Sequence, residues 1–255
     1  MKKEMLQWHV KSPVEPGYHD VILPGRDAME ILAMHRLNLE PGMDFNLHSA
    51  EREMHILLVQ GEAEITGAVQ GRLNKLDSFY IPGEKNVKIQ AVTRCIFYIA
   101  DAPCEGKGRV RMRHFDSSLP IGDIHQIHGQ GSGAREVMFT LAPQDEASRL
   151  ICGVTRSGDG TWTSWPPHQH EADLEEIYCY FDMEKCGLHF SYLTKEKFSD
   201  AICHTVETGS MVQIPAGYHP TAALPGGRNI YFWAMGAKSH DARRYDLAKP
   251  DPEFI

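Results

Sequence analysis

Three histidines in two separate stretches of the chain form the pattern that most constrains its fold. In residues 165–182, His168 and His170 are separated by a single residue. Side chains at i and i+2 of an extended strand point to the same side, so these two imidazoles are expected to converge. A second stretch, residues 209–219, reads GSMVQIPAGYH and ends in His219. The pattern requires a fold that brings two strand edges side by side.

A carboxylate completes the set, since Glu175 and Glu176 follow the first two histidines closely. Three imidazoles and one carboxylate supply three nitrogens and one oxygen, which suits a divalent transition metal. We expect one ion per chain, zinc first, with Mn²⁺ or Fe²⁺ as alternatives. Both stretches resemble the two cupin motifs, one with His-x-His followed by Glu, the other with Gly, five residues and Pro-x-Gly-x-x-His.

The remainder of the chain favours an all-β fold. Short runs rich in Ile, Leu, Val and aromatic residues recur along it, separated by glycine and proline turns, whereas sustained helical periodicity is scarce. This pattern is typical of β-sandwiches and barrels. The polar segment at 103–130 resembles a connection. We therefore predict a bicupin of two β-barrel domains, residues 1–115 and 116–255.

The two halves align as a repeat, and the first half looks degenerate. Placing Ile81-Pro82-Gly83 against Ile214-Pro215-Ala216 puts Asn86 opposite His219. Further upstream, Asn46 and His48 align with the paired histidines, and Glu53 follows. Asparagine is a poor ligand for zinc or iron, so we expect the N-terminal cupin to be structural and free of metal.

Composition excludes several classes of protein. The 255 residues are 42% hydrophobic and 24% charged, with a formal net charge of −8, which is typical of a globular protein and not of a nucleic-acid binder. No apolar run is long enough to span a bilayer, and the N-terminus lacks the apolar core of a signal peptide. None of the six cysteines forms a C-x-x-C pair. We expect a cytoplasmic homo-oligomer that binds a small molecule, without nucleic-acid or membrane partners.

Across residues 135–240 the chain resembles the KduI and IolB family of bicupin sugar-acid isomerases. The resemblance is carried by WTSWPPHQH, LEEIYCYFD, PAGYHPTAALPG and YFWAMGA. It implies a metal-dependent aldose–ketose isomerase, most closely a 5-deoxy-glucuronate isomerase of inositol catabolism. The phrase YCYFDM resembles instead the branch that acts on 4-deoxy-5-ketouronate, so another acidic sugar is the alternative. A cupin oxygenase and a non-catalytic sugar-binding bicupin are the remaining rivals.

The choice between the two glutamates decides which side chains face the metal. Generic cupin spacing selects Glu175, whereas in the isomerase family the ligand directly precedes a Val/Ile-Tyr pair, which selects Glu176. Strand alternation then turns Tyr178 and Tyr180 toward the metal and Ile177 away from it. Tyrosines suit a polar sugar pocket, so the predicted ligands become His168, His170, Glu176 and His219.

The remaining predictions concern catalysis. Isomerisation moves a hydrogen between C2 and C1, either through an enediol, which needs a base near C2, or as a hydride. Glu175, Tyr178 and Tyr180 are the candidate catalytic residues. Gln213 and Arg228 are the candidate substrate-binding residues, for a hydroxyl and for a carboxylate respectively.

Overall fold

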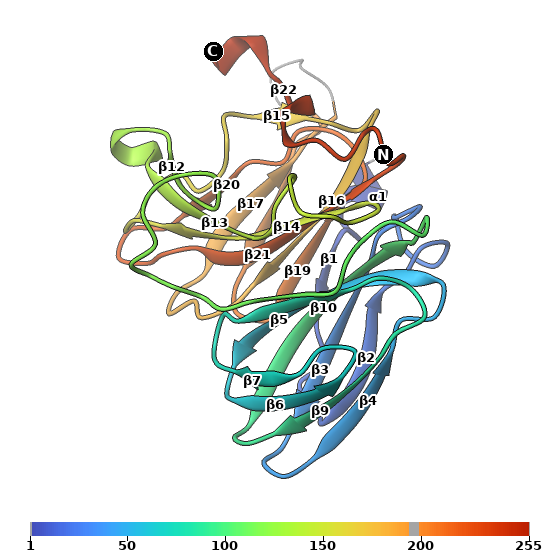
Figure 1. Cartoon of the computed structure of the whole chain (residues 1–255). Helices are drawn as coiled ribbons and strands as arrows, with labels where there is room; N and C mark the ends of the chain where they lie inside the picture. Colours follow the sequence, from blue (N-terminus) through green and yellow to red (C-terminus); the bar gives the residue numbers. More distant parts are fainter. Residues whose placement is uncertain (1, 194–198, 255) are drawn as a thin grey trace.

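The computed structural model describes residues 2–193 and 199–254, and these are mostly β-strands (Figure 1). Two barrels are stacked in this view. The lower one, blue to teal, belongs to the first half of the chain, and the upper one, yellow to red, belongs to the second. The all-β, two-barrel prediction is confirmed. The described helices are too short to cross a membrane: α1 (Lys2–Met5), η1 (Gly131–Gly133), η2 (Tyr245–Leu247) and η3 (Pro252–Phe254).

The N-terminal barrel consists of two antiparallel sheets. Its six-stranded sheet has the order β11 (Arg111–Arg113), β8 (Ser78–Ile81), β5 (Arg52–Gln60), β10 (Cys95–Pro103), β3 (Ala33–Leu39), β2 (Gly17–Ile22). Its four-stranded sheet has the order β4 (Asp44–His48), β9 (Asn86–Ala91), β6 (Ala63–Gly67), β7 (Gly71–Leu73). Alternate side chains point between the two sheets, where Ile56, Phe97 and Ile99 are fully buried in the barrel core.

The C-terminal barrel repeats this plan. Its seven-stranded sheet has the order β1 (His9–Lys11), β19 (Ser210–Ile214), β16 (Leu174–Tyr180), β21 (Ile230–Ala237), β14 (Leu150–Ser157), β13 (Arg135–Leu141), β12 (His125–His128). Facing it are β18 (Ile202–Val206), β17 (Gly187–Ser191) and β20 (Thr221–Ala223). A two-stranded ribbon pairs β15 (His168–Gln169) with β22 (Lys249–Pro250).

The extreme N-terminus belongs to the opposite barrel. Strand β1 pairs antiparallel with β19, with His9 opposite Val212 and Lys11 opposite Ser210. All other strands of the first half stay in the N-terminal barrel, and strands from β12 onward build the C-terminal one. We keep the division at residues 115 and 116 as a proposal, with β1 as an exchanged element.

A third apolar cluster lies between the barrels, where the six-stranded and seven-stranded sheets face each other. Strand β5 contributes Leu57 and Val59 to it, and β16 contributes Ile177 and Cys179. Because both faces of β16 are covered, all seven of its residues are buried. The residues expected to point away from the metal therefore pack against the other barrel.

Two glutamates join the barrels reciprocally. The carboxylate of Glu53 on β5 accepts hydrogen bonds from three successive backbone amides, at 148–150, with distances of 2.6, 2.6 and 2.7 Å. The carboxylate of Glu175 on β16 accepts hydrogen bonds from the amides at 30–32, at 2.6, 3.0 and 3.1 Å. Each glutamate is the second residue of its strand and binds the segment that leads into β14 or β3 of the opposite barrel. The same contact is thus made twice, in opposite directions.

Candidate metal centre

The three histidines of the two sequence stretches meet inside the C-terminal barrel. His168 lies on β15, His170 follows it, and His219 lies in the turn between β19 and β20. One potential ligand atom from each lies within 4.8 Å of the others. The ring centroids of His168 and His219 are 4.5 Å apart, and those of His170 and His219 are 5.0 Å apart. All three are buried.

Glu176 supplies the carboxylate of this cluster. Its Oε2 lies 3.1 Å from Nε2 of His170 and 3.2 Å from Nε2 of His219. Burial alone would raise the pKa of Glu176, but the contacts with His170 and His219 outweigh burial and lower the pKa to about 2. The side chain is therefore an anion at neutral pH.

Backbone carbonyls orient each imidazole. Nδ1 of His168 lies 3.0 Å from the carbonyl of Pro166, and Nδ1 of His219 lies 3.1 Å from that of Gly217. Nδ1 of His170 is likewise 3.1 Å from the carbonyl of residue 174. A carbonyl only accepts hydrogen bonds, so each Nδ1 carries a proton, and Nε2 is the nitrogen that can bind a metal. This is how histidines that ligate metals are held in proteins.

The converging atoms suit a cation. Burial and repulsion by His219 and His170 lower the pKa of His168 well below its usual value, which keeps this ring neutral. Nε2 of His219 is buried and makes no hydrogen bond. Imidazole nitrogens and a carboxylate oxygen therefore converge on one point. A divalent metal ion satisfies all of them at once, so the residues fit the predicted ligand set.

A pocket with aromatic walls extends from this cluster. Its lining includes Trp165, Tyr178, Tyr231, Trp233 and Tyr245, together with His168 and Glu176. The rings of Tyr178 and Tyr231 stack with centroids 4.4 Å apart, and Tyr245 packs edge-on against Trp165 at 5.5 Å. The Tyr231 hydroxyl and the Trp165 indole N–H are bonded to Thr163 and His128, so these rings form a rigid aromatic wall.

A glycine makes room for one of these walls. A Cβ atom on Gly153 of β14 would lie 2.3 Å from the Trp233 ring, so no larger residue fits opposite that indole. Because Gly153 has no side chain, the Trp233 ring can pack directly against the backbone of β14.

Arg135 is the cationic residue of the pocket lining, and sequence reasoning did not select it. It is the first residue of β13, where it shares the inward face with Val137 and Phe139. Only 6% of its surface is exposed. In the sequence, this arginine begins the predicted strand REVMFTL and shares the inward alternation of its apolar residues. Tyr231 and Trp233, from YFWAMGA, and Tyr245 were likewise not selected.

The structure corrects the prediction for Glu175. Its carboxylate lies on the opposite face of β16 from Glu176 and is saturated by the three backbone amides at 30–32. It therefore cannot reach a substrate carbon as a base. The physical reason is strand alternation, which sends adjacent side chains to opposite faces.

Gln213 is corrected for the same reason. It lies directly across from Ile177 on β16, so its side chain shares the interface face of the sheet. Its Oε1 accepts a hydrogen bond from the backbone amide of Ala28 at 2.9 Å. The residue connects the barrels and does not line the pocket.

Two further candidates are placed differently from expectation. Tyr180 faces the barrel interior as predicted, but its hydroxyl is engaged with His189 and Thr221, each at 2.9 Å, and it does not line the pocket. Arg228 is exposed and lines a neighbouring hollow that borders Arg135 from outside. Tyr178 is the one candidate catalytic residue that lines the pocket.

In the N-terminal barrel the aligned residues do not assemble. The pairing of Met54 with Ile81 matches that of Glu176 with Ile214, so Met54, and not Glu53, occupies the ligand position. His48 is exposed. The prediction that this half keeps a histidine and a glutamate at the site is therefore wrong. Within the described residues, the one potential metal cluster is the one in the C-terminal barrel.

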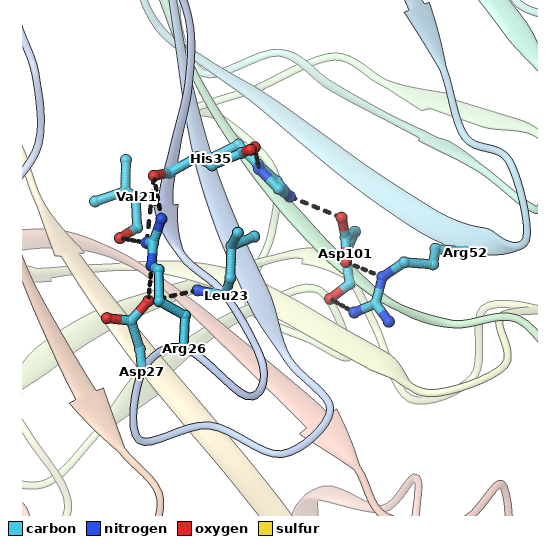
Figure 2. Close-up of polar contacts among 8 residues, drawn as sticks. Val21, Leu23, Arg26, Asp27, His35, Arg52 and Asp101 are labelled. Atoms are coloured by element: carbon cyan, nitrogen blue, oxygen red, sulfur yellow. Dashed lines mark hydrogen bonds and ion pairs between the residues drawn. The ribbon is translucent and has the colours of Figure 1, made fainter.

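Polar residues of another kind occupy the matching end of that barrel. Asp101 lies opposite Met54, just as Met235 lies opposite Glu176. Its carboxylate contacts Nε2 of His35 at 2.7 Å and the guanidinium of Arg52, as Figure 2 shows. A buried ion network thus occupies the position that corresponds to the metal centre.

Comparison with known proteins covers nearly the whole chain. A model of the KduI/IolB family matches residues 12–254. The 5-deoxy-glucuronate isomerase of Geobacillus kaustophilus is 25% identical over 247 residues, which are 88% of this chain and 86% of that protein. The protein of the same name from Bacillus subtilis strain 168 is 26% identical over 239 residues, 86% of this chain and 85% of that one.

Solved structures share the fold. An IolB-like protein from Salmonella typhimurium superimposes with a TM-score of 0.84 at 23% identity, covering 97% of both chains. A mutant of Bacillus subtilis oxalate decarboxylase superimposes with a TM-score of 0.63 at 12% identity, covering 91% of this chain and 77% of that one. Because both identities are below 25%, these similarities show a shared fold.

Proposed function

The chain belongs to the KduI/IolB family, whose relatives above are sugar isomerases, and we propose that it is itself a metal-dependent aldose–ketose isomerase of a sugar acid. The first candidate substrate is 5-deoxy-glucuronate, after the relatives that match most of the chain. The observation that carries the proposal is the buried cluster of three histidines and Glu176 at one end of an aromatic pocket.

His168, His170, His219 and Glu176 would hold the ion, with zinc proposed first and manganese or iron as alternatives. A divalent cation bound there supplies Lewis acidity, which stabilises the negative charge that develops on substrate oxygens during isomerisation. The histidine and glutamate side chains are already oriented by their backbone contacts and by one another, so little reorganisation accompanies binding.

The pocket residues favour direct hydrogen transfer between C2 and C1. Among the described residues, Glu176 is the one carboxylate of the lining, and burial raises the pKa of the Tyr178 phenol well above its usual value. Tyr178 is therefore a hydrogen-bond donor and a poor base. In the proposed step the hydrogen leaves C2 for C1 with its electron pair, and the O2 proton passes to O1, so that the atoms balance.

The test is a panel of sugar acids incubated with metal-loaded and metal-stripped protein in deuterated water. We expect isomerisation of 5-deoxy-glucuronate by the loaded protein only, without oxygen uptake, and NMR should show no deuterium at C1. Deuterium at C1 would show a proton route and remove the hydride assignment. Turnover that survives complete removal of metal would contradict the proposed function.

Two further proposals concern the setting of this activity. The six cysteines are all unpaired, which is typical of a reducing compartment, and we propose that the enzyme acts in the cytoplasm in inositol catabolism. Homo-oligomerisation stays a prediction, which light scattering of the purified protein tests directly.

A further inference from the structure

Arg135 carries a buried positive charge that has no acidic partner among the described residues. Its side chain is 6% exposed, and one nitrogen, Nη1, donates to the carbonyl of Gly133 at 3.1 Å. Among residues 2–193 and 199–254, no Asp or Glu lies within ion-pair distance of its guanidinium. The adjacent Glu136 points to the other face of β13, where it pairs with His125 and Arg156. Most of the N–H donors of Arg135 are therefore free for a ligand.

Burying such a charge is costly unless an anion compensates for it. A guanidinium removed from water loses several kcal/mol of solvation, and partners normally restore it. The lining that contains Arg135 supplies the phenol groups of Tyr178, Tyr231 and Tyr245, whose pKa values are raised by burial. These are neutral groups and provide no counter-charge. The arrangement is what a site for an anionic ligand requires.

The position of Arg135 in the pocket places that anion away from the metal ligands. Strand β21 runs along the pocket wall with Tyr231, Trp233 and Met235 facing inward. Met235 pairs with Glu176. Tyr231 pairs with Thr155 of β14, and Thr155 pairs in turn with β13, two residues after Arg135. At about 3.3 Å per residue, positions 231 and 235 are roughly 13 Å apart along the strand. The lining therefore has a carboxylate and a histidine at one end of this strand wall and a guanidinium toward the other.

We infer that Arg135 binds the carboxylate of the sugar acid, while the opposite end of the carbon chain lies at Glu176 and the histidines. This assignment rests on the proposed function and specifies its substrate class as anionic aldoses with a terminal carboxylate. In such a molecule the carboxylate and the reacting carbonyl are at opposite ends of the carbon chain, and the lining likewise holds the guanidinium of Arg135 apart from Glu176 and His168. The planar guanidinium holds a carboxylate through paired N–H donors and so fixes which end of the sugar enters first.

Arg228, the arginine that the sequence suggested, serves as the matched control. It is exposed, lies outside the pocket that contains His168 and Glu176, and borders two outer hollows. An exposed arginine contributes little to binding because water and salt screen its charge. Replacing each of the two arginines by methionine therefore separates the two assignments.

The experiment measures binding to metal-loaded protein by the fluorescence of Trp165 and Trp233, which both line the pocket. Glucuronate is the anionic probe and glucose is the neutral one. We expect Arg135→Met to weaken glucuronate binding about 10- to 100-fold, the usual effect of losing a charged hydrogen-bond partner. Arg135→Lys should lie in between, because it keeps the charge and loses the paired donors. Glucose binding and metal content should stay unchanged, and Arg228→Met should behave as wild type.

Three results would overturn the assignment. One is an unchanged preference for glucuronate over glucose in Arg135→Met. Another is an equal loss of both sugars in Arg135→Met and Arg135→Lys, which would indicate a structural role. The third is a loss of glucuronate binding in Arg228→Met alone. Since binding is measured without turnover, a wild type that binds glucuronate through Arg135 but isomerises no sugar acid would refute the proposed function and leave this inference standing.

Discussion

Glu175 and Glu176 are adjacent in the chain, yet their carboxylates enter different environments. Glu176 faces two imidazole nitrogens at 3.1 and 3.2 Å inside the barrel. Glu175 faces three backbone amides of the other barrel. Both are about 99% buried, so burial alone does not distinguish a ligand from a structural residue. The groups that each carboxylate contacts distinguish the ligand from the structural residue, and strand alternation determines which groups each one contacts.

This difference predicts opposite effects for the same substitution. Glu176→Gln should lower metal affinity and reduce isomerase turnover about 100-fold or more, because the charge that holds the ion is removed. Glu175→Gln should keep full metal content but lose roughly 3 kcal/mol of unfolding free energy, since an amide replaces a charged acceptor of several backbone donors. Metal analysis and chemical denaturation check the pair. Loss of metal in Glu175→Gln with full metal in Glu176→Gln would mean that the register of β16 is shifted by one residue.

Asp101 is the second carboxylate whose neighbours determine its behaviour. Burial opposes its ionisation, but the hydrogen bond with His35 and the charges of His35 and Arg52 outweigh burial and lower its pKa (Figure 2). His35 also contacts the half-exposed Asp20 at 2.8 Å. An acid with a lowered pKa in the folded state binds its proton more readily when unfolded. Its contribution to stability is therefore present above the unfolded pKa, about 3.9, and is lost as pH falls through the folded pKa.

We predict that Asp101→Asn lowers the free energy of unfolding by about 3 kcal/mol at pH 7, because it leaves a buried ion network incomplete. The difference from wild type should shrink as the pH falls from about 4, the pKa of the unfolded chain, through the lowered pKa of folded Asp101. Asp20→Asn, on the exposed side of the same histidine, should cost less than about 1 kcal/mol. Urea unfolding at several pH values measures these effects, and a difference independent of pH would contradict the role given to the Asp101 charge.

At the scale of elements, the C-terminal segment is part of the site. Strand β22 pairs with β15, so that Pro250 lies opposite His168. The amide of Asp251 donates to the carbonyl of Pro167 at 2.7 Å, and Tyr245 lines the pocket. Figure 1 shows β22 lying beside β15 at the top of the upper barrel. These polar last residues position a predicted ligand as well as wrapping the surface.

Removing residues 249–255 should therefore weaken metal binding by about 10- to 100-fold, the usual cost of losing the contacts that orient a ligand. The histidines themselves remain, so binding should be weakened and not abolished. Removing only residues 252–255 leaves β22 and Asp251 in place and should have an effect of a few fold at most. Competition against a chelator gives both affinities. Equal affinities for the two shortened chains would exclude a role for β22.

At the scale of the whole molecule, the two barrels depend on each other. They share the apolar cluster that contains Leu57, Val59, Ile177 and Cys179. Strand β1 completes the seven-stranded sheet from the N-terminal end of the chain. Each barrel also binds backbone amides of the other through Glu53 or Glu175. Separation would expose the shared cluster to water and remove the backbone amides of the opposite barrel that Glu53 and Glu175 bind.

Residues 116–255 expressed alone should accordingly fail to form a cooperatively folded metal-binding barrel. We expect aggregation, or a weak near-ultraviolet circular dichroism signal together with a broad thermal transition. Addition of residues 1–115 should restore both folding and metal binding, which serves as the control for intact ligands. A sharp transition and full metal affinity in the isolated half would contradict the dependence proposed here.

The sequence by itself determined the all-β class, the two-barrel plan and the convergence of His168, His170 and His219. These follow from local rules, since turn residues delimit strands and i, i+2 spacing sets a common face. Combined with the family phrasing, strand alternation also selected Glu176 and placed Tyr178 inward. Such inferences need only the geometry of one strand and its immediate neighbours.

Only the tertiary structure decided what covers each face. Glu175 and Gln213 were predicted near the substrate, but the face they share is sealed by the other barrel, whose backbone amides they bind. Arg135 and Tyr245 lie far from the histidines in sequence and reach the pocket because β13 and the C-terminal segment pass beside it. The alternation of side chains along a strand predicts which residues share a face of the sheet. What lies on that side depends on contacts between segments distant in the chain, and no local pattern encodes those.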